Sequence, residues 1–132
     1  TCGFTEFAPL PFVHMGAPIY IRGMSRPGPT WDEVVLVHAV ARLAFDGLID
    51  NIQASWVKLG LQDGLTLLAA GANDLGGTLM DEYISAAAGA SHGTMTGAED
   101  FAAAIESIGR TPRQRTTLYQ DATTLRIVGG IS

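Results

Sequence analysis

The sequence is poor in charged side chains. Only 16% of its 132 residues are Asp, Glu, Lys or Arg, whereas 47% are hydrophobic. An average soluble domain has roughly 25% charged residues. The high hydrophobic share excludes a disordered or linker-like chain. Because a small domain has much surface to cover, this composition favours a part of a larger assembly over a self-sufficient monomer.

Cysteine and basic charge are scarce as well. The single cysteine, Cys2, excludes an internal disulfide and a cluster held only by cysteines of this chain. Eight basic residues against 13 acidic ones give a net charge of -5, which argues against a nucleic-acid partner. No two histidines have the spacing of a helical metal motif, so we expect no metal held by this chain.

Long apolar runs are also absent. No stretch reaches the 18 or so apolar residues that a membrane span needs, and no basic-then-apolar leader opens the chain. We therefore expect a cytoplasmic protein without a membrane partner. The chain opens on Thr1 rather than Met, and we expect residues 1–132 to be one domain, a fragment of a longer enzyme.

The sequence contains an alternation of β-favouring and helical segments. Strands are expected at 4–14, 51–57 and 72–76, and helices at 31–45, 60–70, 81–88 and 97–108. Capping boxes, Thr30 with Glu33 and Thr96 with Glu99, mark the starts of the first and last helices. The proline-rich segment 15–30 is expected to be a long loop.

This alternation predicts an α/β protein with about three βα units and a parallel sheet. Three units are too few to close a barrel, so strand edges and apolar helix faces need a partner. The helix at 31–45 is apolar on several sides, and His38 within it is expected to have a packing role. We therefore expect the chain to self-associate.

Candidate functional groups follow the expected strands, because binding groups in parallel α/β folds collect at the carboxyl ends of strands. His14 follows the first strand and is either a site residue or a structural histidine. Asp74 is either a ligand contact or an ion-pair partner of Lys58 or an arginine. The run at 76–78 either cradles an anion or forms a tight turn, and Arg110, Arg113 and Arg115 either bind an anion or pair with neighbouring carboxylates.

Five blocks of the sequence resemble one enzyme family. They are FTEFAPLPFVH, NIQASWVKLG, GANDLGGTLM, AAGASHG and GRTPRQRTTLY, and they run in order from residue 4 to residue 119. Together they resemble the C-terminal part of the tyrosine-utilising half of FO synthase, a radical S-adenosylmethionine enzyme of deazaflavin (coenzyme F-420) biosynthesis. Radical enzymes of the futalosine menaquinone pathway are the nearest alternative, and a non-catalytic binding or assembly module is a further one.

The resemblance implies a fold and a reaction. The fold is the C-terminal portion of a (β/α) TIM-type radical S-adenosylmethionine barrel. The full-length enzyme uses a 4Fe–4S cluster and S-adenosylmethionine to join a tyrosine-derived fragment to 5-amino-6-ribitylaminouracil. The CxxxCxxC motif that holds the cluster in the family is missing from this sequence. We therefore expect an enzyme by family whose fragment is inactive alone and binds no cofactor alone.

The resemblance also implies roles for single residues. Pro11 and Phe12 would lie beside the adenine of S-adenosylmethionine. Six residues would face the substrates, namely His14, Ser55, Lys58, Asn73, Asp74 and Thr78. No catalytic residue is assigned.

Overall fold

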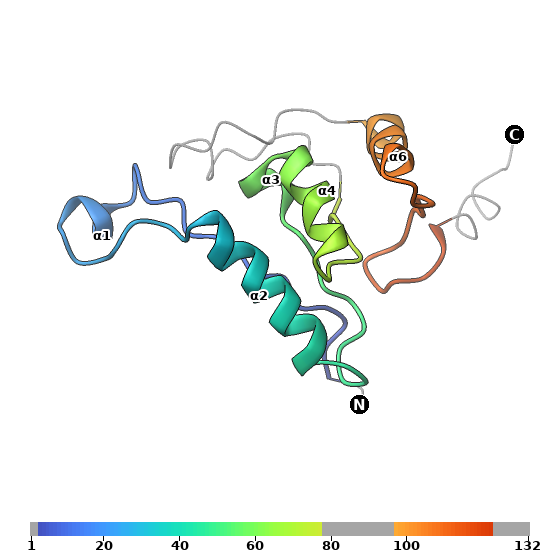
Figure 1. Cartoon of the computed structure of the whole chain (residues 1–132), viewed down its shortest axis with the longest axis horizontal. Coiled ribbons are helices and arrows are strands. Elements are labelled where there is room, and N and C mark those ends of the chain that lie inside the picture. Colours follow the sequence, from blue (N-terminus) through green and yellow to red (C-terminus); the bar gives the residue numbers. More distant parts are fainter. Residues whose placement is uncertain (1–2, 78–96, 123–132) are drawn as a thin grey trace, which may run out of the picture. The chain divides into compact units, whose positions relative to one another are not determined.

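The computed structural model of the chain describes residues 3–77 and 97–122 (Figure 1). These residues fall into two units that divide between Gly97 and Ala98. The first unit contains α1 (Pro18–Ile21), α2 (Trp31–Ala44), α3 (Trp56–Leu59) and α4 (Leu61–Ala69), and the second contains α6 (Ala98–Ser107). The predicted helix at 81–88 lies outside the described residues, as do Thr78 and the cap at Thr96.

Three short segments of the first unit pair in parallel. Phe7 pairs with Ile52, and Gln53 pairs with Asp74. The backbone N–H of Gln53 donates to the Phe7 carbonyl at 2.9 Å, and that of Ala54 donates to the Asp74 carbonyl at 2.8 Å. Helix α2 connects the first segment to the second, and α4 precedes the third. The predicted βαβ order is therefore confirmed.

The paired segments are shorter than the predicted strands. The expected strand at 51–57 is wrong at its end, because Trp56 and Val57 begin α3 instead. Both side chains are buried there, so a short helix places them in the core as well as a strand would. In the first segment only Phe7 forms a bridge; Pro9 and Pro11, which follow, have no N–H with which to extend the ladder.

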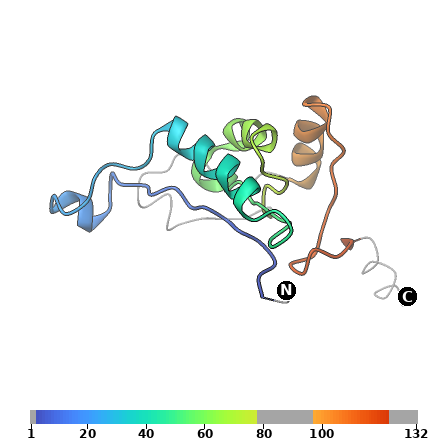
Figure 2. The same ribbon diagram turned by 60° about the horizontal axis from the view of Figure 1, so that its bottom comes forward.

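The two faces of these segments differ in character. Ile52 and Ala54 are completely buried, and the ring of Phe7 contacts that of Phe45, just beyond α2, at a centroid distance of 5.0 Å. Figure 2 shows the N-terminal segment running alongside α2. Successive side chains of a strand point to opposite faces. Gln53 therefore points away from the face that packs on the helices.

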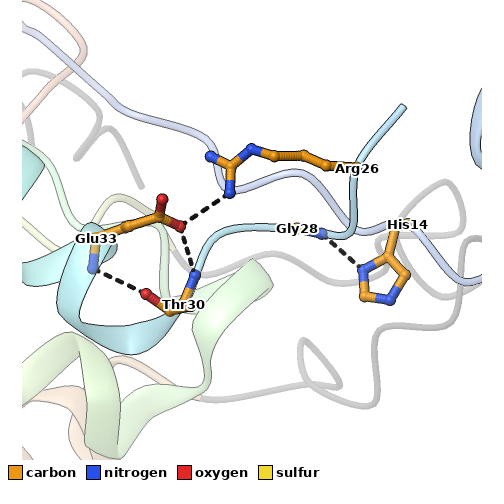
Figure 3. Close-up of polar contacts among 5 residues, drawn as sticks. All are labelled: His14, Arg26, Gly28, Thr30 and Glu33. Atoms are coloured by element: carbon orange, nitrogen blue, oxygen red, sulfur yellow. Dashed lines mark hydrogen bonds and ion pairs between the residues drawn. The ribbon is translucent and has the colours of Figure 1, made fainter. Parts of the chain in front are cut away.

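Helix α2 begins at the predicted capping box. The Thr30 hydroxyl accepts from the Glu33 N–H at 3.3 Å, and the Glu33 carboxylate accepts from the Thr30 N–H at 2.8 Å. The Arg26 guanidinium donates to the same carboxylate oxygen at 3.1 Å (Figure 3). The predicted helices at 31–45 and 60–70 are confirmed as α2 and α4, each within one residue of its expected ends.

The predicted loop at 15–30 contains a helix, so the prediction of a structureless segment is wrong. Pro18 opens α1, and proline suits the first turn of a helix because its fixed φ is already helical and its missing N–H needs no partner there. In Figure 1, α1 stands apart from α2 and α4.

The second unit contains the predicted C-terminal helix and the arginine cluster. The helix expected at 97–108 is confirmed as α6, and after it Arg115 and Asp121 pair as an antiparallel bridge. The Arg113 guanidinium lies 2.9 Å from the Asp121 carboxylate, and that of Arg115 lies 3.9 Å from the centre of the Tyr119 ring. Arg113 thus follows the carboxylate-pairing alternative.

The Glu33 carboxylate makes the start of α2 sensitive to acid. The N–H of Thr30, followed by the Arg26 side chain, holds the pKa of Glu33 below its usual value. In the unfolded chain that pKa is about 4.3. The stabilisation is therefore fully present above the unfolded pKa and is lost as the pH falls through the lower, folded pKa.

We expect the first turn of α2 to loosen below about pH 4. The amide NMR resonances of Thr30 and Glu33 should shift together through that range. Glu33→Gln should abolish the shift, because it removes the titrating carboxyl. Glu106→Gln in α6 is the control and should leave it unchanged, whereas an identical titration in Glu33→Gln would contradict the assignment.

Candidate functional site

A row of polar side chains crosses the paired segments on the face opposite the helices. The row consists of Glu6, Gln53 and Asp74, one from each segment. The side-chain nitrogen of Gln53 donates to the Asp74 carboxylate at 3.3 Å and lies 3.5 Å from the Glu6 carboxylate. Two acidic groups thus flank one amide. We call these three residues the polar row.

The turn that follows Asp74 supports the row. The Asp74 oxygen that accepts from Gln53 also accepts the Gly76 N–H at 2.6 Å. Gly76 has φ +85°, and a β-carbon there would lie 3.3 Å from the Gln53 nitrogen. The Gln53 amide therefore packs against a position that favours glycine. The indole N–H of Trp56 donates to the Gly77 carbonyl at 3.0 Å. Of the two alternatives for 76–78, these contacts favour a tight turn.

Asn73 belongs to a different cluster, next to Asp74 in sequence. Its side-chain oxygen accepts from the Arg42 guanidinium at 2.9 Å and from the Ile52 N–H at 2.8 Å. The same guanidinium donates to the carbonyls of Gly71 and Asp50, both at 2.8 Å. We call this group the Arg42 clamp. It lies at the amino ends of the second and third segments, where they leave the preceding helices.

His14 closes the loop that carries α1. Its Nδ1 accepts the Gly28 N–H at 2.9 Å (Figure 3), so a neutral His14 carries its proton on Nε2. The edge of the imidazole meets the Tyr20 ring at 4.6 Å. A β-carbon on Gly28 would collide with the Phe12 carbonyl. One face of His14 thus has the structural role, and Nε2–H is the group left to meet a ligand.

The remaining predicted site residues flank these clusters. Ser55 is the N-cap residue of α3 and Lys58 lies in its last turn; both are half-buried. Pro11 is half-buried, and Phe12 is 39% exposed. The structure thus brings Asp74 into the polar row, gives Asn73 to the Arg42 clamp and places His14 in the loop closure.

Two residues of the row, Glu6 and Gln53, were missing from the predicted site. The signal for Gln53 was available: Asn51, Gln53 and Ser55 alternate with the apolar Ile52 and Ala54. A polar residue at every second position marks the face of a strand that does not join the helix-packed core. Glu6 follows from the same alternation, since its neighbour Phe7 packs toward α2.

The row offers acceptor oxygens and little positive charge. Carboxylates and an amide carbonyl suit a ligand rich in N–H or O–H groups. Within residues 3–77 and 97–122, no three His, Cys, Asp or Glu side chains are grouped so that they could hold a metal ion. None of the described helices is long and apolar enough to cross a membrane.

Comparison with known proteins agrees with the resemblance. The family model described as the CofH/MqnC C-terminal region matches residues 1–127. The chain belongs to this family. The family's name refers to the C-terminal part of its members, which agrees with the part of FO synthase that the five sequence blocks resemble.

Curated relatives of the family member are enzymes. The 5-amino-6-(D-ribitylamino)uracil--L-tyrosine 4-hydroxyphenyl transferase of Methanothermobacter thermautotrophicus is 54% identical over 121 residues, 92% of this chain and 33% of the relative. The enzyme of that name from Methanopyrus kandleri is 60% identical over 120 residues, 91% and 32%. FO synthase of Mycobacterium leprae is 54% identical over 119 residues, 90% and 14%. The chain thus spans a third or less of each. No solved structure matches.

Arg42 should carry more stability than an ordinary surface arginine. We expect Arg42→Met to lower the free energy of unfolding by about 2 kcal/mol, because three acceptors at the segment starts lose a charged donor. Arg22→Met, at an exposed position of the α1 loop, should change it by less than about 0.5 kcal/mol. Urea titration measures both. Equal losses in the two variants would contradict a structural role for the clamp.

Proposed function

We propose that this chain supplies the later βα units of an FO synthase-type transferase. Such an enzyme joins a tyrosine-derived fragment to 5-amino-6-ribitylaminouracil by radical S-adenosylmethionine chemistry. The single observation that carries the proposal is identity of 53% or more over nine-tenths of the chain to enzymes with these names. The polar row supports it, because an amino acid and a ribitylated uracil both present many hydrogen-bond donors.

The proposed fold is the C-terminal portion of a (β/α) TIM-type barrel. Parallel pairing in chain order, with helices α2 and α4 as the connections, supports this fold. In such a barrel the polar row would face the interior, and the Arg42 clamp would lie at the amino ends of the strands. That end of a barrel serves stability, whereas substrates bind at the carboxyl ends.

In the proposed site, Asp74 is the central substrate contact, because its carboxylate is held in the polar row. Ser55, Lys58, Thr78 and the Nε2–H of His14 would complete the substrate contacts. Asn73 was expected among them, but its amide is held by Arg42 and Ile52, and we assign it to positioning the third segment. Pro11 and the partly exposed Phe12 offer an apolar surface beside which adenine would lie.

The iron–sulfur cluster does not fit the residues of this chain. A 4Fe–4S cluster needs several thiolates, and the sequence has one cysteine. Cluster binding therefore belongs, in this proposal, to the part of the enzyme that the chain does not cover. The role of this chain's residues is to bind and orient substrates and to keep water from a radical.

A chimera tests the proposal. The third of the Methanothermobacter transferase that aligns with this chain is replaced by residues 1–127, and transfer of the hydroxyphenyl group to 5-amino-6-ribitylaminouracil is measured. We expect the chimera to form product, and Asp74→Asn to lower kcat/KM by about tenfold or more, because a charged hydrogen-bond acceptor is lost.

Thr66→Ala, at an exposed position of α4, is the control and should leave kcat/KM within about twofold. This chain without the grafted enzyme should form no product. A chimera that folds and binds its cluster but forms no product would refute the proposed function.

The exposed side of α2 supports a second proposal, that the isolated chain self-associates. Leu36, Val40 and Leu43 of α2 are 61%, 52% and 80% exposed. Beside them, seven apolar residues line an open groove of about 330 Å³, namely Phe7, Leu36, Val37, Val40, Ala41, Ala44 and Phe45. Exposed apolar area of this kind favours association, and the low charge content opposes it weakly. In the isolated chain we assign the groove to a second copy.

Sedimentation of the isolated chain tests this assignment. We expect a dimer or larger species at tens of micromolar, and dissociation toward monomer when Leu36 and Val40 are both changed to Ser, because the apolar face is lost. Leu118→Ser is the matched control, since Leu118 is 68% exposed but lies outside α2. A monomeric wild-type chain, or equal effects of the two changes, would contradict the assignment.

A further inference from the structure

We infer that Gln53 determines specificity in the proposed site, by presenting its side-chain oxygen to the ammonium group of the amino-acid substrate. The inference rests on the proposed function and adds a residue that neither the resemblance nor the comparisons assign. It begins from how the Gln53 amide is held in the polar row.

The orientation of the amide follows from its neighbours. Both polar groups nearest its nitrogen are carboxylates, those of Asp74 at 3.3 Å and Glu6 at 3.5 Å. Carboxylates only accept hydrogen bonds when ionised, so the NH₂ group and not the oxygen must face them. With both N–H groups directed at acids, the side-chain oxygen of Gln53 is turned away from them.

The amide is also fixed in place. A β-carbon at Gly76 would lie 3.3 Å from the Gln53 nitrogen and 3.6 Å from its oxygen, so the amide lies along the backbone of the turn. Gln53 itself sits in a segment paired on both sides, to Phe7 and to Asp74. An acceptor held in this way loses little conformational entropy when a ligand binds.

The charge around this oxygen selects the ligand. An acceptor between two carboxylates lies in a negative potential and favours a positively charged donor over a neutral one. Of the two compounds in the relatives' names, L-tyrosine carries an ammonium group. The amino groups of the ribitylaminouracil are attached to an electron-poor ring and stay neutral. The geometry therefore assigns the row to tyrosine.

Steady-state kinetics in the chimera test the role of Gln53. Gln53→Met keeps the length of the side chain but removes its acceptor. We expect it to raise KM for tyrosine by about tenfold or more, and to leave KM for the ribitylaminouracil within about twofold. Gln53→Glu keeps acceptor oxygens, so at pH 8 its KM for tyrosine should stay within about threefold of the wild-type value.

A tyrosine analogue without the amino group separates recognition from folding. Inhibition by 3-(4-hydroxyphenyl)propanoate should be the same in wild type and Gln53→Met, because the analogue has no ammonium to lose. An equal weakening of tyrosine and analogue, an effect confined to the ribitylaminouracil, or an equal loss in Gln53→Glu would each overturn the inference.

The outcome is distinguishable from failure of the proposed function. If the wild-type chimera forms product, only the inference is at stake in the variants. If it forms none, the proposed function fails, and calorimetric titration of the chimera with tyrosine and with the analogue tests Gln53 directly. Tighter binding of tyrosine that Gln53→Met abolishes supports the inference, and any other result overturns it.

Discussion

The guanidinium of Arg42 is the interaction on which the arrangement of the first unit depends. From the last turn of α2 it reaches the carbonyls of Asp50 and Gly71 and the side chain of Asn73. Asn73 in turn holds the backbone N–H of Ile52. One side chain thus sets the end of a helix against the starts of two segments whose own ladder is short. The pairing of Gln53 with Asp74 follows from that register.

The short ladder explains why side chains carry so much of the structure. Strands in globular proteins usually run five or six residues, but here proline removes donors after Phe7, and α3 begins at Trp56. Side-chain contacts take the place of missing ladder bonds: the Arg42 clamp on one face and the polar row on the other. The row tolerates two carboxylates because the amide of Gln53 separates them and donates to both.

Local signals in the sequence were sufficient for the helices. Thr30 and Glu33 predicted the start of α2, because a capping box depends on residues three positions apart. The order of strands and helices was predictable for the same reason. The end of the second strand was not: Trp56 and Val57 are apolar, and burial alone does not distinguish a strand from a turn of helix. Asn73 and Asp74 were placed in one site because both follow a predicted strand. Their separation depends on which face each side chain takes, and the partners Arg42 and Gln53 are distant in sequence.

The adjacency of Asn73 and Asp74 limits how this segment can change in evolution. One residue serves the scaffold and the next serves the site, and the two faces exchange with every step along a strand. A single insertion or deletion between Gly71 and Asp74 would turn the carboxylate toward the buried helices and leave the Arg42 guanidinium without its amide partner. Substitutions can accumulate here one at a time, but length changes must be confined to the connections outside the paired segments.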